Sequence, residues 1–337
     1  MLLFLANIIE QLDLAVEHLE KGDANNARFA LMLSDNAIEL MLHRVAQDQR
    51  RKLKSYQHLE KTYPHKAALD RAQGRHFEEK VKFAKLEAKL SEDQADTLMI
   101  AHAFRNEVYH VGVQHEAILT AVAGFHIKTV CDFLTSYSPT FMSWGSNQRL
   151  PERAKAYFSD PGILKPGVEN EFHAACRVLA LKTGHSDKAF AETLASHMAE
   201  TVKEKDTFID YISTGAPRRQ TRDEVVIDCQ VWPLAFSEEG KRFAQDNKFP
   251  GGNMPVFIKW LAKNYPLQFK GDPIPSWKKR ADQLFQERNS AKALKKYRTF
   301  MDETADLREQ IDETTSQVDN YIDEQIDRAR EARHMRD

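Results

Sequence analysis

The residues best suited to chemistry in this sequence are an arginine and a histidine five positions apart, Arg105 and His110, in the stretch RNEVYH. Histidine titrates near neutral pH and can take a proton from a ribose 2′-hydroxyl or give one to a leaving 5′-oxygen. Arginine stays charged and binds phosphate through a planar fork, so it can stabilise the added negative charge of a phosphorane-like transition state. Together they predict metal-independent cleavage of RNA, without a cofactor.

The spacing within this stretch decides how the side chains can meet. Asn106 and His110 are four residues apart and lie on one helix face, so the asparagine can orient the imidazole. Arg105 and His110 lie about 140° apart on an ideal helix, so one helix presents them poorly to a single phosphate. Two copies meeting near a two-fold axis, or a distortion of the helix near Gly112, would bring them to one phosphate, and the geometry favours a homodimer. The alternative, two surface residues with Arg105 paired to a carboxylate, remains open.

This pattern resembles the HEPN superfamily, whose members carry R-x4–6-H, with a polar residue after the arginine, on a late helix of a small α-helical bundle. The resemblance covers residues 1–138, where residues 36–42, NAIELML, are also similar to the apolar helix with an embedded acidic residue in such bundles. It implies a homodimeric endoribonuclease with Arg105, Asn106 and His110 as the catalytic set. It also implies a setting in toxin–antitoxin or antiviral-defence systems, including abortive infection, with an antitoxin or defence protein as partner.

One feature of the family is absent from this chain. Members that are silenced by adenylylation carry a tyrosine two residues after the histidine, and Gly112 stands at that position here. The resemblance therefore does not extend to that mode of control.

Three further residues are predicted to support the site. Glu39 lies among apolar residues, and a buried carboxylate needs a partner. That partner is Arg105 or His110, or else Glu39 forms a purely structural salt bridge. Tyr109 directly precedes the histidine. His102 lies one helical turn before the arginine, where it could extend an RNA-binding surface.

A basic cluster is the candidate for binding RNA phosphates, although a solvated face explains it equally well. Its members are Arg50, Arg51, Lys52 and Lys54. The whole chain has 48 basic and 50 acidic residues and a net charge of −2, so its overall charge predicts no polyanionic partner. Residues 278–298 are mainly basic and residues 302–327 mainly acidic, so these two blocks can pair with each other.

Several common enzyme classes are disfavoured. The sequence has no GxxxxGK[ST], GxGxxG, HExxH or GxSxG motif, which argues against P-loop, Rossmann, zincin and serine-hydrolase chemistry. Its three cysteines, Cys131, Cys176 and Cys229, are far apart, so no zinc or disulfide site is expected and a cytoplasmic location is indicated. No apolar run reaches the ~18 residues that cross a bilayer, so no membrane association is expected.

The hydrophobic pattern predicts a mainly α protein. Residues 1–138 form a helical bundle, in which Ser91 and Gln94 predict a capping box at the start of the helix that carries Arg105 and His110. The apolar residues of the helix that follows Asp23 occupy more than one stripe, so a second face is expected to meet a partner.

The remainder of the chain is predicted from its composition. Residues 139–168 are rich in proline and glycine and form a linker. Residues 169–280 form a mainly α domain with a short strand at 224–232 and a long loop at 249–277. Residues 281–337 form a long charged helix.

Two alternatives to the ribonuclease stand beside it. The first is a non-catalytic HEPN-like module for dimerisation and partner recruitment. The second is a magnesium-dependent nuclease in the C-terminal half, because Asp228-x-Gln230 on the expected strand faintly resembles the D-[DE]-x-K pattern, although the lysine is absent.

Overall fold

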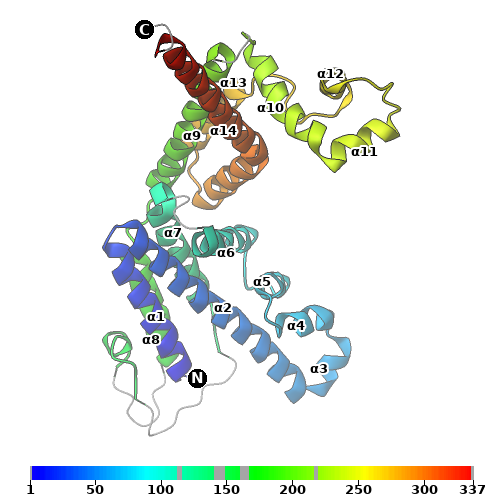
Figure 1. Ribbon diagram of the computed structural model, residues 1–337. Coiled ribbons are helices and arrows are strands. Elements are labelled where there is room, and N and C mark those ends of the chain that lie inside the picture. Colours follow the sequence, from blue (N-terminus) through cyan, green and yellow to red (C-terminus); the bar gives the residue numbers. More distant parts are fainter. Residues whose placement is uncertain (1, 112–115, 140–148, 160–166, 216–218, 335–337) are drawn as a thin grey trace. The chain divides into compact units, whose positions relative to one another are not determined.

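The computed structural model describes residues 2–111, 116–139, 149–159, 167–215 and 219–334, without the side chains of residues 57, 59, 108–111 and 332–334. The described residues form fourteen α-helices and one short 3-10 helix, and no strand (Figure 1). The prediction of a mainly α protein is confirmed. Contacts divide the chain into unit 1, Met1–Leu194 with Gln286–Lys296, and unit 2, Ala195–Phe285 with Tyr297–Asp337.

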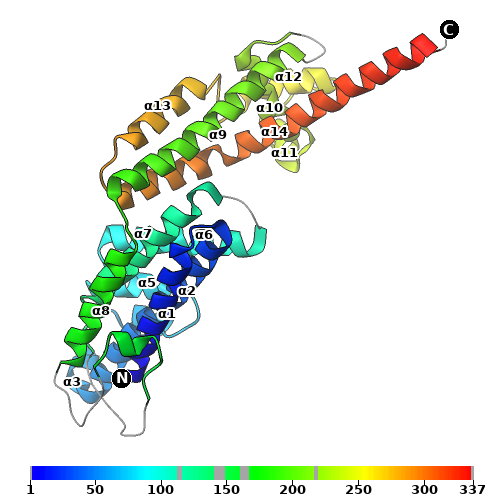
Figure 2. The ribbon, with the colours of Figure 1, turned by 90° about the vertical axis from the view of Figure 1, so that its left-hand side faces the viewer.

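Unit 1 is a helical bundle. Its long helices are α1 (Leu2–Glu20), α2 (Ala24–Ser55), α6 (Glu92–Val111), α7 (Glu116–Leu134) and α8 (Val168–Lys182). Its short helices are α3 (Gln57–Thr62), α4 (Lys66–Ala72), α5 (Phe77–Leu86) and the 3-10 helix η1 (Ala154–Ala156). Helix α2 packs against α1, α5, α6 and α7, so it lies at the centre of the bundle (Figure 2).

Local sequence signals set the starts of the two helices that matter most for the site. Asp23 caps α2 by accepting a hydrogen bond from the backbone N–H of Asn26 at 3.0 Å. Ser91 Oγ accepts from the N–H of Gln94 at 3.2 Å, and Gln94 Oε1 accepts from the N–H of Ser91 at 3.0 Å. The predicted capping box is therefore confirmed at the start of α6.

Helix α7 is apolar along most of its length. Among the described residues it is the one helix long and apolar enough to cross a membrane, and 72% of its most apolar window is buried inside the bundle. Its packing against α1, α2, α6 and α8 accounts for this composition without a membrane.

Unit 2 contains most of two long helices and four shorter ones. They are α9 (Asp187–Gly215), α10 (Arg222–Phe236), α11 (Glu238–Asp246), α12 (Met254–Asn264), α13 (Ile274–Phe285) and α14 (Ser290–His334). The first residues of α9 and of α14 belong to unit 1. Helix α8 follows the predicted linker at 139–168 and packs on α1 and α7, so residues on both sides of that segment belong to unit 1.

The predicted strand at 224–232 is wrong, because these residues lie within α10. Thr221 and Glu224 form a capping box, in which each side chain accepts a hydrogen bond from the other residue's backbone N–H. Val225, Val226 and Cys229 are buried at helical spacing. The preference of β-branched residues for strands is weak and depends on context, so the cap and the buried helical face prevail over it.

The predicted long loop at 249–277 is also wrong for most of its length, because it contains α12 and the start of α13. Pro255 and Pro275 each occupy the second position of a helix, where the missing N–H breaks no helical hydrogen bond. The side chain of Asn253 caps α12 by accepting from the N–H of Val256 at 3.2 Å. These prolines start helices here and do not mark a loop.

The long helix predicted from residue 281 is interrupted. Helix α13 ends at Phe285 and α14 begins at Ser290. The side chain of Asn289 accepts from the N–H of Lys292 at 2.9 Å and caps α14. The charged C-terminal helix therefore starts nine residues later than its pattern suggested.

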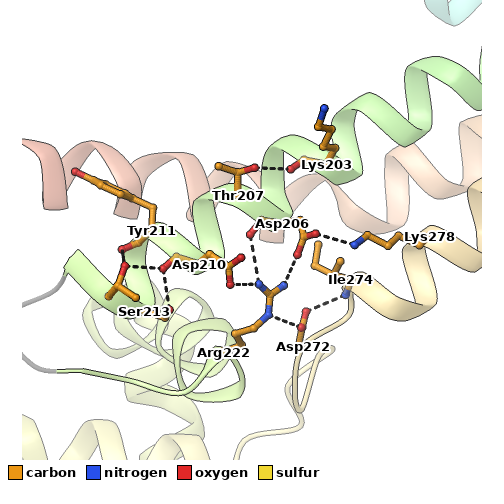
Figure 3. A network of polar contacts seen from close by, with 11 residues as sticks. Lys203, Asp206, Thr207, Asp210, Tyr211, Ser213, Arg222, Asp272, Ile274 and Lys278 are labelled. Atoms are coloured by element: carbon orange, nitrogen blue, oxygen red, sulfur yellow. Dashed lines mark hydrogen bonds and ion pairs between the residues drawn. The ribbon is translucent and has the colours of Figure 1, made fainter.

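Arg222 joins three parts of unit 2 (Figure 3). Its guanidinium donates to Asp206 Oδ1 on α9 at 2.6 Å, to Asp210 on the same helix, and to Asp272 Oδ2 before α13 at 2.7 Å. Lys278 Nζ also donates to Asp206, at 2.7 Å. One arginine thus neutralises carboxylates that would otherwise repel one another where three segments meet.

We expect Arg222→Met to lower the free energy of unfolding by about 2 kcal/mol, because three aspartates would lose a charged hydrogen-bond donor while the aliphatic stem is kept. Denaturant unfolding measures the change. Arg219→Met is the matched control, since Arg219 is exposed and makes no such contact among the described residues. Equal effects of the two substitutions would contradict this role for Arg222.

Candidate functional site

The candidate site is organised around Asp35, a carboxylate of α2 that is completely buried. His102 Nδ1 of α6 lies 3.0 Å from both carboxylate oxygens of Asp35. Arg105 Nε, one turn further along α6, lies 3.6 Å from Asp35 Oδ2, which is within ion-pair range but too long for a hydrogen bond. Asp35 is therefore the acidic partner of Arg105 within the bundle.

Arg105 has a second polar contact on its own helix. Its Nη1 donates to Asn106 Oδ1 at 2.8 Å. The arginine side chain is 34% exposed, so the guanidinium is held from two sides and still reaches solvent. This arrangement restrains the cation without enclosing it, as a phosphate-binding arginine requires.

The partners that sequence reasoning expected for this arginine lie in the last turn of α6. Tyr109 and His110 belong to the helix, but their side chains lie outside the described residues. The structure therefore leaves the distance between Arg105 and His110 as a prediction, together with the expected contact between Asn106 and His110.

Glu39 has a different partner from the catalytic candidates. Its Oε1 accepts from Lys80 Nζ of α5 at 2.8 Å, and Lys80 is buried. Of the two alternatives for Glu39, the structure contains the structural salt bridge.

Sequence reasoning missed the role of Asp35 although a signal was present. The core stripe of α2 contains Leu31, Asp35, Ile38 and Leu42, all buried. A carboxylate at a core position of an apolar stripe needs an internal cation or donor. The apolar period of α2 therefore marks Asp35 as a better candidate than Glu39 for the buried carboxylate of the site.

His102 is fixed inside the bundle. Its ring stacks on Phe77, with the ring centroids 4.2 Å apart and the planes 10° apart. Together with its contact to Asp35, this stacking gives His102 the role of aligning the carboxylate that faces Arg105. The sequence suggested that His102 could extend an RNA-binding surface. That role would need more of its imidazole ring to be exposed than the stacking on Phe77 allows.

A second buried polar pair links α2 to α7 beside Asp35. Ser34 Oγ lies 2.8 Å from the carbonyl oxygen of Ala30, and His126 Nδ1 lies 2.8 Å from the same Oγ. The tautomer of His126 decides whether Nδ1 donates to Ser34 Oγ or accepts from it. Its Nε2 is buried without a hydrogen-bond partner. Burial lowers the pKa of His126 to about 4, against opposing effects of Asp35.

This histidine predicts acid sensitivity. Its pKa is near 6.5 when the chain is unfolded and about 4 in the folded state, so the unfolded state binds a proton that the folded state does not. The free energy of unfolding should therefore be fully retained above pH 6.5 and fall by about 3 kcal/mol as the pH drops to 4. The free energy of unfolding, measured across this pH range, should change less with pH in His126→Gln than in the wild-type protein. An unchanged slope would contradict the assignment.

The basic cluster is only partly available for phosphates. Arg50 pairs with Asp70, and Arg51 Nη1 lies 3.5 Å from Asp48 Oδ1. Lys52 and Lys54 are exposed and form no ion pair among the described residues. Lys52 also lines a cavity of about 300 Å³. Two of the four predicted RNA contacts thus remain unneutralised.

The alternative of a C-terminal nuclease loses its structural premise. Asp228 and Gln230 lie on α10, not on a strand. Gln230 uses its amide to bind the backbone of Phe269, and Asp228 accepts from Gln220 at 2.5 Å. Among the described residues no cluster of three or more histidines, cysteines or carboxylates could hold a metal ion.

Comparisons with known proteins add no relative to this description. No protein-family model, no curated protein and no solved structure matches the chain.

Proposed function

We propose that this protein is a metal-independent endoribonuclease of the HEPN type that acts as a toxin or antiviral-defence effector in the cytoplasm. The observation that carries the proposal is the contact of Arg105 with the buried Asp35, because it gives the arginine of the RNEVYH stretch a fixed direction while leaving it exposed to a ligand. An ion pair between Arg105 and a carboxylate is also what the non-catalytic alternative predicts, so the end groups of the RNA product decide between the two.

The proposed reaction is a transesterification, in which the ribose 2′-hydroxyl and not a water molecule attacks phosphorus. His110 takes the proton of the 2′-hydroxyl, and the 2′-oxygen forms a bond to phosphorus as the bond from phosphorus to the 5′-oxygen breaks. The leaving oxygen is protonated by the second histidine of a dimer or by water. Arg105, supported by Asn106, stabilises the negative charge that builds up on the phosphoryl oxygens. The products are a 2′,3′-cyclic phosphate and a 5′-hydroxyl.

A homodimer is part of the proposal, because Arg105 and His110 point about 140° apart on an ideal helix. The outer face of α2 supports it. Phe29 is 52% exposed and Leu40 is 41% exposed, and the half-buried Leu33 lies between them at helical spacing. Apolar residues left in water along a central helix of the bundle favour a second copy as their cover. The same face equally favours the alternative function, a dimerisation module without catalysis.

The end groups of the product test the proposal. Wild-type protein incubated with single-stranded RNA in EDTA should release fragments that end in 2′,3′-cyclic phosphate and begin with 5′-hydroxyl, identified by end-specific enzymatic labelling. Fragments with 5′-phosphate, or cleavage that requires added magnesium, would contradict it. A dimer without any cleavage of RNA would favour the dimerisation module.

A further inference from the structure

Five cations of one segment of unit 2 lack acidic partners. The segment comprises α11, α12 and the residues up to 270, and we refer to residues 237–270 as the α11–α12 segment (Figure 1). It has six basic and three acidic residues. Its exposed cations without an ion pair among the described residues are Arg242, Lys248, Lys259, Lys263 and Lys270. Lys241 is the exception, since it pairs with Glu238 at 2.8 Å.

Charge is distributed unevenly within unit 2. The stretch of α14 from residue 302 to 327 carries ten carboxylates and one arginine, whereas the α11–α12 segment carries a positive excess. Several cations elsewhere in the unit, such as Arg222, Lys205 and Arg280, are paired with carboxylates. Exposed cations without an ion pair among the described residues also occur elsewhere in unit 2, at Lys203, Arg219 and Lys279, but five of them lie on the α11–α12 segment.

Aromatic rings lie among these cations. Phe249 and Trp260 have ring centroids 5.2 Å apart, and Phe243 lies 5.8 Å from Trp260 and 4.8 Å from Tyr265. These four rings are half-buried, so part of each remains in contact with water. Phe243, Trp260 and Tyr265 pack on a small apolar core that includes Leu261.

Helix geometry places rings and cations together on α12. At 100° per residue, Lys259, Lys263 and Trp260 fall within a sector of about 100°. Ile258 and Leu261, which are buried, occupy the opposite side of the helix. One outer face of α12 therefore presents two unpaired lysines next to an indole ring.

The segment is held firmly against α10. Gln230 Nε2 donates to the carbonyl of Phe269 at 2.8 Å, and Gln230 Oε1 accepts from the N–H of the same residue at 3.1 Å. In the first turn of α11, a Cβ on Gly240 would lie 2.0 Å from the carbonyl oxygen of Leu234 in α10, so only glycine fits. The backbone that carries the rings and cations is thus anchored to α10.

We propose that the α11–α12 segment is a binding surface for single-stranded RNA, with phosphates on its unpaired cations and bases stacked on its half-buried rings. Exposed bases stack on aromatic side chains, and phosphates bind lysine and arginine with release of counterions. A duplex hides its base faces, so it would use the cations but not the rings. The inference rests on the proposed function in taking RNA as the nucleic acid, and it places a second RNA contact outside the proposed catalytic site.

The test is a binding measurement that does not depend on cleavage. Fluorescein-labelled U20 RNA is titrated with full-length His110→Ala protein in EDTA, and anisotropy is followed at several salt concentrations. Adding Lys259→Ala and Lys263→Ala should weaken binding about fivefold or more and lower the slope of log K against log salt by about 1.4. The matched control adds Lys203→Ala and Lys279→Ala, two exposed lysines of the same unit without ion pairs, and should leave affinity within about twofold.

Competitors separate RNA binding from simple charge attraction. Unlabelled U20 should displace the probe at lower concentration than the same length of duplex RNA or vesicles containing phosphatidylserine. Absence of binding, equal losses in the test and control variants, or equal competition by duplex or vesicles would overturn the inference. If the wild-type protein does not cleave RNA, this binding measurement is unaffected. Failure of the proposed function can therefore be distinguished from failure of this inference.

Discussion

Replacing His110 with alanine is expected to lower the rate of RNA cleavage by about a thousandfold, which is the typical contribution of a positioned general acid or base. Single-turnover cleavage of labelled RNA measures the rate, and thermal unfolding shows whether the fold is kept. Arg105→Ala is expected to cause a loss of similar size, because it removes the cation that stabilises the transition-state charge.

The sequence offers a matched control for this prediction. Arg71 and His76 have the same spacing as Arg105 and His110, but Gly74 lies between them and no asparagine follows the arginine. His76 is exposed and lies just before α5. His76→Ala should therefore leave the rate of cleavage unchanged. Equal rates in His110→Ala and His76→Ala would show that His110 is not catalytic.

Asp35→Ala is expected to lower the free energy of unfolding by about 3 kcal/mol, because it leaves His102 and Arg105 without their buried carboxylate. Asp35→Asn keeps an oxygen that can accept from His102 but removes the charge that faces Arg105. We expect it to retain most of the stability and to lower kcat more than it raises KM, as befits a residue that positions Arg105.

The control for Asp35 is an exposed aspartate of the same unit. Asp70 pairs with Arg50 on the surface, with half of its side chain exposed, so Asp70→Ala should change the free energy of unfolding by less than about 1 kcal/mol. Urea denaturation of the four proteins compares them directly. If Asp35→Ala is as mild as Asp70→Ala, the buried pair does not hold the bundle together. If Asp35→Asn cleaves RNA at the wild-type rate, Asp35 does not position Arg105.

The helices of the bundle could be predicted because their signals are local. Asp23 before α2 and the pair Ser91 and Gln94 before α6 act on neighbours three residues away. The apolar period of α1 likewise follows directly from the sequence. Such features depend only on residues that are close in the sequence, so contacts with distant segments do not change them.

The helices of the second half are harder to predict from the sequence, because neighbouring residues there favour different kinds of secondary structure. In α10, β-branched residues favour a strand while the capping box of Thr221 and Glu224 favours a helix, and burial of Val226 and Cys229 on one face decides the outcome. In α12 and α13 the prolines predict breaks in helical structure, although they stand at helix starts. Only the tertiary packing distinguishes these cases.

Within the candidate site, the stretch RNEVYH could be found from sequence and its carboxylate partner could not. Asp35 and Arg105 are separated by 70 positions, and only the packing of α2 on α6 brings them together. Glu39 looked equivalent in sequence, but it lies one turn further along α2, where Lys80 is closer. Pairing across helices depends on their relative rotation, which no local pattern specifies.

The measurement that tests the central claim most directly is cleavage of 5′-labelled single-stranded RNA in EDTA by wild-type protein and His110→Ala, purified side by side. We predict cleavage by the wild type without any metal ion and none detectable by the variant at equal concentration and equal thermal stability. Equal cleavage by both proteins, or cleavage by the wild type only after magnesium is added, would contradict the assignment of the chemistry to Arg105 and His110.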